Sequence, residues 1–288
     1  AAQVRFAFKT APQHTTWPQI LAVWQAADAV EVFESGWTFD HFQPIFSDPS
    51  GPCLEGWTTL AALAAATSRL RLGTLVTGIH HRHPAVLAKM AATLDTISEG
   101  RLELGVGAGW NEDESQAYGI ELGSLKDRFD RLDEACQVLV SLLSRETTDF
   151  DGRFYRLRGA RNEPKGPQRP HPPICVGGNG EKRTLRIAAT YAQHWNFVGG
   201  TPAEFARKRD VLAAHCADVG RDPKEILLSA HLRLGPDLRY RALIEDTIAL
   251  AAEGLDLAII YLPVPHDPSV IEPLAEAIRD SGLWRPQH

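Results

Sequence analysis

The sequence has few cysteines, and none of them are spaced as a disulfide or metal framework would require. Its four cysteines lie far apart, and no C-x-x-C pair occurs. Small secreted scaffolds and structural zinc sites use closely spaced cysteines instead. We therefore expect reduced cysteines and a cytoplasmic location.

Long apolar runs and a basic excess are also missing. No apolar stretch reaches the roughly 18–20 residues that a membrane-spanning helix needs. The formal net charge is -6, whereas proteins that bind nucleic acid or membrane surfaces usually present a basic face. We expect a soluble protein that acts on a small molecule, with no nucleic-acid or membrane partner. We also expect a homodimer.

Three common catalytic motifs are absent as well. There is no G-x-S-x-G, so a hydrolase nucleophile elbow is not supported. There is no H-E-x-x-H, and no carboxylate follows His80, His81 and His83 at ligand spacing, so no metal site is expected. In RLELGVGAGWNEDE (101–114) the third glycine of a dinucleotide-binding G-x-G-x-x-G would fall on Trp110, and that motif fails too.

What the sequence does contain is a regular alternation of short apolar segments and amphipathic segments. The apolar segments predict eight strands, at 4–8, 35–39, 70–76, 101–107, 173–178, 194–198, 225–232 and 256–262. The amphipathic segments predict eight helices, at 17–27, 55–67, 85–97, 125–143, 181–190, 202–219, 241–252 and 268–278. The segment 145–173 interrupts this rhythm and reads as an ordered surface excursion.

Strands that alternate with helices form parallel sheets, and eight such units in about 250 residues have the size of a (β/α)8 barrel. We therefore predict an α/β fold, a single-domain (β/α)8 TIM barrel over residues 1–288. A doubly wound sheet is the alternative. In a barrel the active site lies at the carboxyl ends of the strands.

Two glycine-rich loops follow predicted strands at that end. GGNGEKR (177–183) combines bare backbone N–H groups with Lys182 and Arg183, which suits a phosphate; a tight turn with solvated charges is the alternative. In GAGWNEDE (107–114), Asn111 and Glu114 have the spacing of a capping box. Because that helix start is acidic, its glycines suit a flat, uncharged ring better than a phosphate.

The adjacent Asp40 and His41 leave two interpretations open. They form either a buried pair that holds a strand end or a site that presents an imidazole to a substrate or cofactor.

Three longer stretches together resemble a known family. They are FESGWTFDHF (33–42), the central stretch from RLRLG to GWNEDE (69–114), and NEPKG to QHWN (162–196). The chain resembles the bacterial luciferase-like superfamily and, within it, the coenzyme F420-dependent oxidoreductases. The resemblance runs from the first strand to the last helix.

The resemblance implies a luciferase-like barrel with a deazaflavin or flavin ring at its mouth and a cis peptide at Leu75-Val76. It assigns the ring and its phosphate to one set of residues: Asp40, His41, Leu75, Val76, Thr77, Gly107, Ala108, Gly109, Trp110, Gly177, Gly178 and Asn179. The implied reaction is hydride transfer between C5 of coenzyme F420 and an organic substrate. His41 is the first candidate for moving the proton and His81 the second.

Two departures narrow the implied reaction. Trp110 stands where the sugar-phosphate dehydrogenase branch has an acid, so sugar-phosphate oxidation is not expected. Only residues 233–240 separate the seventh strand from its helix, so the long insertion of luciferase proper is missing. The alternatives are an FMN-dependent monooxygenase, a non-catalytic flavin-binding protein, and a barrel lyase that uses Lys182 or Lys89. The loops do not reveal the substrate.

Overall fold

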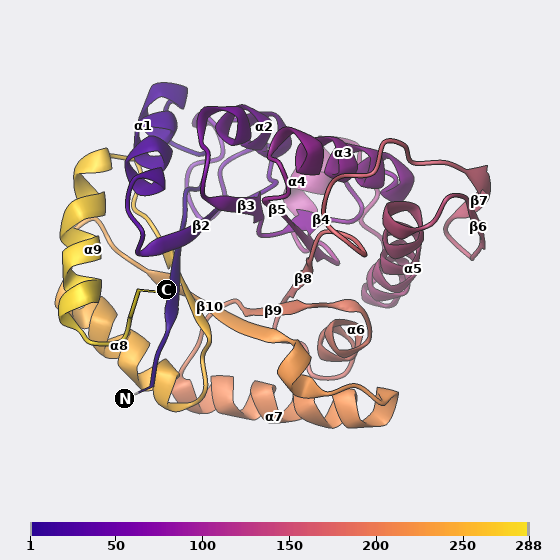
Figure 1. Ribbon diagram of the computed structural model, residues 1–288. Helices are drawn as coiled ribbons and strands as arrows, with labels where there is room; N and C mark the ends of the chain where they lie inside the picture. Colours follow the sequence, from indigo (N-terminus) through magenta and orange to yellow (C-terminus); the bar gives the residue numbers. More distant parts are fainter. Residues whose placement is uncertain (1, 287–288) are drawn as a thin grey trace.

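The structure, a computed structural model that describes residues 2–286, is a closed barrel of parallel strands with helices outside it (Figure 1). The barrel strands are β1 (Arg5–Lys9), β2 (Phe33–Thr38), β3 (Arg71–Thr74), β4 (Thr77–Gly78), β5 (Leu102–Gly107), β8 (Ile174–Gly177), β9 (His194–Phe197), β10 (Leu227–Arg233) and β11 (Leu257–Tyr261). They pair in the order β3-β2-β1-β11-β10-β9-β8-β5-β4, and β3 also pairs with β5, which closes the ring. The (β/α)8 prediction is confirmed, and the doubly wound alternative is wrong.

Helices cover the outside of this ring. They are α1 (Trp17–Asp28), α2 (Gly56–Ala66), α3 (Pro84–Ile97), α5 (Leu125–Ser144), α6 (Thr184–Tyr191), α7 (Pro202–Val219), α8 (Tyr240–Ala252) and α9 (Ile271–Asp280), with short 3-10 turns at Pro223–Glu225 and Pro268–Val270. Local sequence sets their ends. Thr16 and Gln19 form a capping box at the start of α1, and α7 ends at Gly220 in the left-handed conformation.

The main hydrophobic core lies between the sheet and the helices. Phe8 and Phe33 from the strands pack edge to face, and Trp24 from α1 packs on Phe8; all three are fully buried. Gly36 lets these rings approach β2, because a Cβ there would lie 2.6 Å from Trp24. This packing fixes the strands, whose carboxyl ends carry the site.

The structure differs from the predicted elements in four places. The third strand is divided into β3 and β4 by the cis peptide Leu75-Val76. A short helix, α4 (Glu112–Ala117), follows β5, and α6 begins at Thr184 because Leu185 N–H bonds the carbonyl of Gly180 and leaves 181–183 as a turn. The 145–173 excursion contains an antiparallel hairpin, β6 (Thr148–Asp151) and β7 (Arg156–Ala160), beside α5 (Figure 1). Its strands have only four and five residues and carry few apolar side chains, so periodicity missed them.

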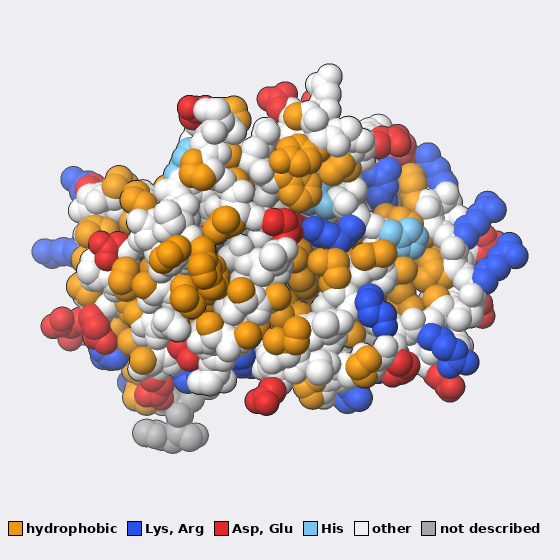
Figure 2. Space-filling model, turned by 90° about the horizontal axis from the view of Figure 1, so that it is seen from above, with side chains coloured by type: hydrophobic (Ala, Val, Ile, Leu, Met, Phe, Trp, Pro, Cys, Tyr) orange, Lys and Arg blue, Asp and Glu red, His pale blue; other side chains and the backbone are white. Residues whose placement is uncertain are grey.

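Acidic and basic side chains are interspersed over the face shown in Figure 2, so neither sign of charge predominates there. Among the described helices, none has both the length and the apolarity to span a bilayer. The predicted domain limits of 1–288 include residues 1, 287 and 288, which lie outside the described residues.

Candidate active site

A cavity of about 640 Å³ opens at the carboxyl ends of the barrel strands. This volume lies in the usual range for sites that hold a small molecule or cofactor. Most of the residues assigned by resemblance line it: Asp40, His41, Leu75, Val76, His81, Gly107, Ala108, Gly109, Trp110, Gly177 and Gly178. The fold thus brings together residues from distant parts of the chain, as the barrel prediction requires.

Thr77 and Asn179 do not line the cavity. The Thr77 hydroxyl is buried, accepts a hydrogen bond from Nε1 of Trp57 and bonds the hydroxyl of Thr74. The Asn179 amide joins two loops, since it donates to the carbonyl of Gly199 and accepts from the backbone N–H of Val198. Both residues therefore stabilise the cavity wall through these hydrogen bonds without facing the cavity.

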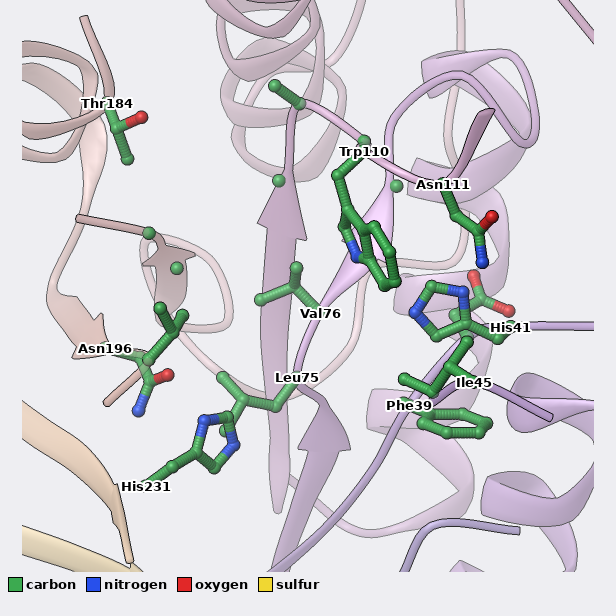
Figure 3. Close-up of a pocket in the computed structure, with 18 of the residues that line it drawn as sticks. Phe39, His41, Ile45, Leu75, Val76, Trp110, Asn111, Thr184, Asn196 and His231 are labelled. Atoms are coloured by element: carbon green, nitrogen blue, oxygen red, sulfur yellow. The ribbon is translucent and has the colours of Figure 1, made fainter. Parts of the chain in front are cut away.

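The cis peptide at Leu75-Val76 is present where the resemblance implied it. Figure 3 shows both side chains in the middle of the cavity, with His41 and Trp110 on one side and His231 and Asn196 on the other. The Val76 side chain also explains why two neighbouring positions are glycine. A Cβ at Gly107 would lie 2.8 Å from Val76, and one at Gly177 would lie 3.1 Å away.

The other glycines of the 101–114 stretch likewise have close neighbours within the chain. A Cβ at Gly105 would lie 1.9 Å from the carbonyl oxygen of Thr74, and Gly109 has a positive φ of 88° with His80 beside it. The chain therefore needs these glycines for its own packing, whatever ring approaches them.

His41 forms an ion-pair contact that the sequence did not reveal. Its Nδ1 lies 2.9 Å from Oε1 of Glu114, and Oε2 of Glu114 accepts hydrogen bonds from the backbone N–H groups of Phe42 and Gln43. Burial raises the pKa of Glu114, but the bonds from His41 and the backbone outweigh it and hold that pKa below its usual range. No hydrogen bond among the described residues reaches Nε2 of His41, and the ring lines the cavity.

The capping-box interpretation of Glu114 is therefore only half right. Asn111 does cap α4 by accepting from the backbone N–H of Glu114. The Glu114 side chain turns away from the cap and binds the 41–43 segment instead. It brings a carboxylate to His41 although Trp110 occupies the position where the sugar-phosphate branch has its acid.

Asp40 is buried and does not pair with His41. Its carboxylate accepts from Arg82 at 2.6 Å, and Nδ1 of His81 lies 3.6 Å away. Burial raises the pKa of Asp40, but His81 and Arg82 outweigh it and hold that pKa below its usual value. Asp40 thus orients Arg82 and His81, whereas Glu114 binds His41.

The three histidines of the 80–83 loop have separate roles. His80 bonds the hydroxyl of Ser115, and burial lowers its pKa to about 3. His81 lies between Asp40 and Glu114, and His83 caps α3 by accepting from Ala85. Within residues 2–286 no group of three or more His, Cys, Asp or Glu side chains could hold a metal ion.

The 177–183 loop wraps around Thr184, the first residue of α6. Gly178 has a positive φ of 133°, and a Cβ there would lie 2.9 Å from the Thr184 methyl group. Within the described structure, the start of α6 has no side-chain cap, and Thr184 lines the cavity. Helix starts whose N–H groups lack a cap bind anions, so this corner suits a phosphate. Lys182 and Arg183 are exposed and do not line the cavity.

An aromatic pair forms part of the cavity mouth. Trp110, half exposed, stacks on the exposed ring of Phe46 at 5.3 Å between centroids, and it meets His41 edge-on at 5.4 Å. Phe46 comes from the loop after β2, where nothing in the pattern predicted a site residue.

Sequence reasoning also missed the polar residues on the far wall. Asn196, whose Nδ2 donates to the hydroxyl of Ser229, keeps Oδ1 buried without a partner in the described chain. Lys9, His231, Arg233 and Tyr261 line the same wall. Lys9 lies at the end of the first strand and could have been found there, had the strand been extended by one residue.

Fold and site together define a barrel of the luciferase-like class. The family model described as luciferase-like monooxygenase matches residues 4–275, and the chain belongs to this family. The F420-dependent hydroxymycolic acid dehydrogenase of Mycobacterium tuberculosis is 32% identical over 217 residues, which cover 74% of this chain and 58% of that protein. The pyrimidine monooxygenase RutA of Methylobacterium radiotolerans is 36% identical over 174 residues, which cover 58% and 44%.

Among solved structures, an F420-dependent secondary alcohol dehydrogenase in complex with an F420-acetone adduct superposes with a TM-score of 0.84 at 18% identity, covering 96% of this chain and 100% of the other. At this identity the likeness supports the fold. The matches span about half the length of the curated relatives.

Proposed function

We propose that the protein is an oxidoreductase that uses coenzyme F420 to transfer a hydride to or from a small organic substrate. The observation that carries this proposal is a cavity at the carboxyl ends of the strands whose wall presents an imidazole, His41, held by the buried carboxylate of Glu114. The F420-dependent dehydrogenase relative, which matches 74% of the chain, supports this cofactor.

The residues of the cavity fit such a group. Val76 and the glycine wall at 107–109 offer an apolar, side-chain-poor surface for a planar ring. Gly177, Gly178 and Thr184 would hold a phosphate at the uncapped start of α6, and the unpartnered Oδ1 of Asn196 would accept from a ring N–H. When bound, coenzyme F420 supplies a carbon that carries the hydride, C5 of its deazaflavin ring.

The chain itself supplies the proton and the orientation. Glu114 binds Nδ1 of His41, so the other nitrogen, Nε2, is the atom that would exchange a proton with the substrate oxygen. His81 is the second candidate, because it lies 3.9 Å from the same carboxylate. The aromatic pair at the mouth would exclude water from the ring.

Two other functions compete with the F420-dependent oxidoreductase. An FMN-dependent monooxygenase is supported by the RutA relative, which matches 58% of the chain. A flavin-binding protein without chemistry would use the same cavity. A lyase that uses Lys182 or Lys89 has no support, because neither lysine lines the cavity and Lys89 donates to the carbonyl of Glu163.

Turnover tests the proposal directly. The protein is supplied with oxidised F420 and a panel of alcohols, or with reduced F420 and the matching carbonyl compounds, and cofactor absorbance is followed. We expect catalysed change with at least one pair. Oxygen-dependent product formation with reduced FMN alone would favour the monooxygenase, and binding of either cofactor without turnover would favour the carrier.

We also propose that the protein works in the cytoplasm as a homodimer. Four unpaired cysteines are compatible with a reducing compartment. Gel filtration with light scattering tests the homodimer.

A further inference from the structure

The cavity has a cationic wall that the proposed reaction does not use. Lys9 ends β1, Tyr261 ends β11 and Arg233 ends β10; these strands are neighbours, and their registers place Tyr261 opposite both Lys9 and Arg233. All three residues line the cavity. Nζ of Lys9 lies 4.9 Å from the centre of the Tyr261 ring, and the Arg233 guanidinium lies 5.1 Å from it.

These two cations lack counter-ions in the described chain. Neither Lys9 nor Arg233 forms a salt bridge with any described acidic side chain, since the carboxylates of the cavity are bound elsewhere: Asp40 by Arg82 and Glu114 by His41. Lys9 is only 4% exposed. Its ammonium group donates to the carbonyl of Leu75 at 2.7 Å and lies 3.3 Å from Nε2 of His231.

A buried ammonium without an anion is costly, and the chain meets this cost in part by neutralising it. Burial and then the charge of Arg233 lower the pKa of Lys9 to about 7. A bound anion would reverse that effect, because an opposite charge nearby favours the protonated amine. The geometry therefore suits a ligand that brings its own negative charge.

We propose that Lys9 and Arg233 bind a carboxylate of the organic substrate above Tyr261. This inference rests on the proposed function, which assigns the glycines at the ends of β5 and β8 to the cofactor. The cationic wall belongs to β1, β11 and β10, and β9 separates it from β8 in the barrel order. Figure 3 shows His231, from the same wall, on the other side of Leu75 from His41.

A carboxylate fits this pair better than a neutral group. The planar guanidinium of Arg233 can donate to both carboxylate oxygens, and the ammonium group of Lys9 adds a further donor. The substrate's reacting carbon would then lie between this anchor and His41. The predicted substrate class is a small hydroxy or oxo acid.

The test measures carboxylate binding by calorimetry, with and without F420. The probes are acetate, lactate and benzoate, each with its primary amide, and inorganic phosphate. The variants are Lys9→Met and Arg233→Met, which keep an unbranched stem and lose the charge. Arg241→Met is the control, because that side chain is 95% exposed on α8.

We expect at least one acid to bind more tightly than its amide, and each cavity variant to weaken it about 10–100-fold, the effect of losing one charge-assisted hydrogen bond. The control should not change it, and F420 affinity should stay within a few-fold. Equal binding of acid and amide, no binding of any acid, or tighter binding of phosphate would overturn the carboxylate subsite.

The two proposals fail separately. If F420 binds the wild type and the acids do not, only the subsite is wrong. If both variants weaken F420 and leave acid binding unchanged, the cations serve the cofactor and the subsite is again wrong. If F420 does not bind the wild type, the proposed function is wrong, and acid binding is read from the F420-free protein.

Discussion

Nδ1 of His41 lies 2.9 Å from Oε1 of Glu114, across 73 positions of sequence. The contact joins the end of β2 to the start of α4 and fixes which ring nitrogen faces the cavity. Glu114 also holds two backbone N–H groups of the same loop. One carboxylate thus sets both the position of the loop and the orientation of the imidazole.

Replacing Glu114 tests the positioning role. Glu114→Gln keeps acceptor oxygen and shape but loses the charge that stabilises a protonated His41. We expect turnover to fall about 10–100-fold, by the usual strength of a hydrogen bond to a charged group, while F420 affinity stays within a few-fold. Asp113→Asn is the matched control, because its side chain is exposed on the same helical turn and forms no hydrogen bond or salt bridge with the described residues. Unchanged turnover would assign Glu114 to the scaffold alone.

Removing the imidazole tests the catalytic role. His41→Ala should bind F420 within a few-fold and lose about 10²–10⁴ in turnover, the usual contribution of a positioned acid or base. Single-turnover rates and thermal unfolding are measured on the same sample, with His81→Ala beside it. If His81→Ala loses more turnover than His41→Ala, the proton passes through His81 instead. A large fall in melting temperature with an intact rate would make His41 structural.

Asp40→Asn should destabilise the protein through Arg82. The substitution removes the closer of the two carboxylates that pair with the Arg82 guanidinium, which is 16% exposed, and leaves Glu55 at 3.8 Å. Removing one partner of a buried pair costs about 3–5 kcal/mol, and the remaining Glu55 places the loss at the lower end of that range. Because the folded pKa of Asp40 is lowered, its ionised form stabilises the fold above the unfolded pKa of about 3.9, and that contribution is lost as pH falls through the folded value. Urea unfolding should therefore show a wild-type advantage at neutral pH that shrinks in acid.

The exposed Asp246→Asn on α8 serves as the control for that experiment, and it should not change unfolding at either pH. A wild-type advantage that is equally large in acid would contradict the assigned charge state of Asp40.

Thr184→Val tests the phosphate corner. The change keeps the shape of the side chain and removes its hydroxyl from the cavity wall, so F420 affinity should fall about 3–10-fold, the effect of one hydrogen bond. Thr190→Val on the same helix is the control, since its hydroxyl bonds the Arg186 carbonyl away from the site. Gly178→Asp is less clean, because the positive φ of Gly178 and the nearby Thr184 would strain any side chain. Equal affinity in both valine variants would remove Thr184 from the phosphate site.

The barrel could be predicted because its signals are local. Apolar runs of four to eight residues marked the strands, and amphipathic periodicity marked the helices between them. The glycine loops and the 40–41 pair could be placed at the mouth because parallel strands all end there. The resemblance supplied the cis peptide at Leu75-Val76, which no periodicity reveals.

The partners of these residues could not be predicted, because they depend on side-chain contacts between distant segments. Asp40 and His41 are adjacent in sequence but bind Arg82 and Glu114 from different loops. Glu114 fitted a local capping motif, and the local interpretation hid its long-range role. Lys9 and Arg233 carry no motif at all; only closure of the barrel places them over one tyrosine ring.

The most direct test of the central claim is the relative affinity for the two cofactors. Purified protein is titrated with F420 and with FMN, each oxidised and reduced, and ligand fluorescence or absorbance is followed to saturation. We predict that F420 binds at least about tenfold more tightly than FMN, a difference of about 1.4 kcal/mol. Equal or tighter binding of FMN would contradict it.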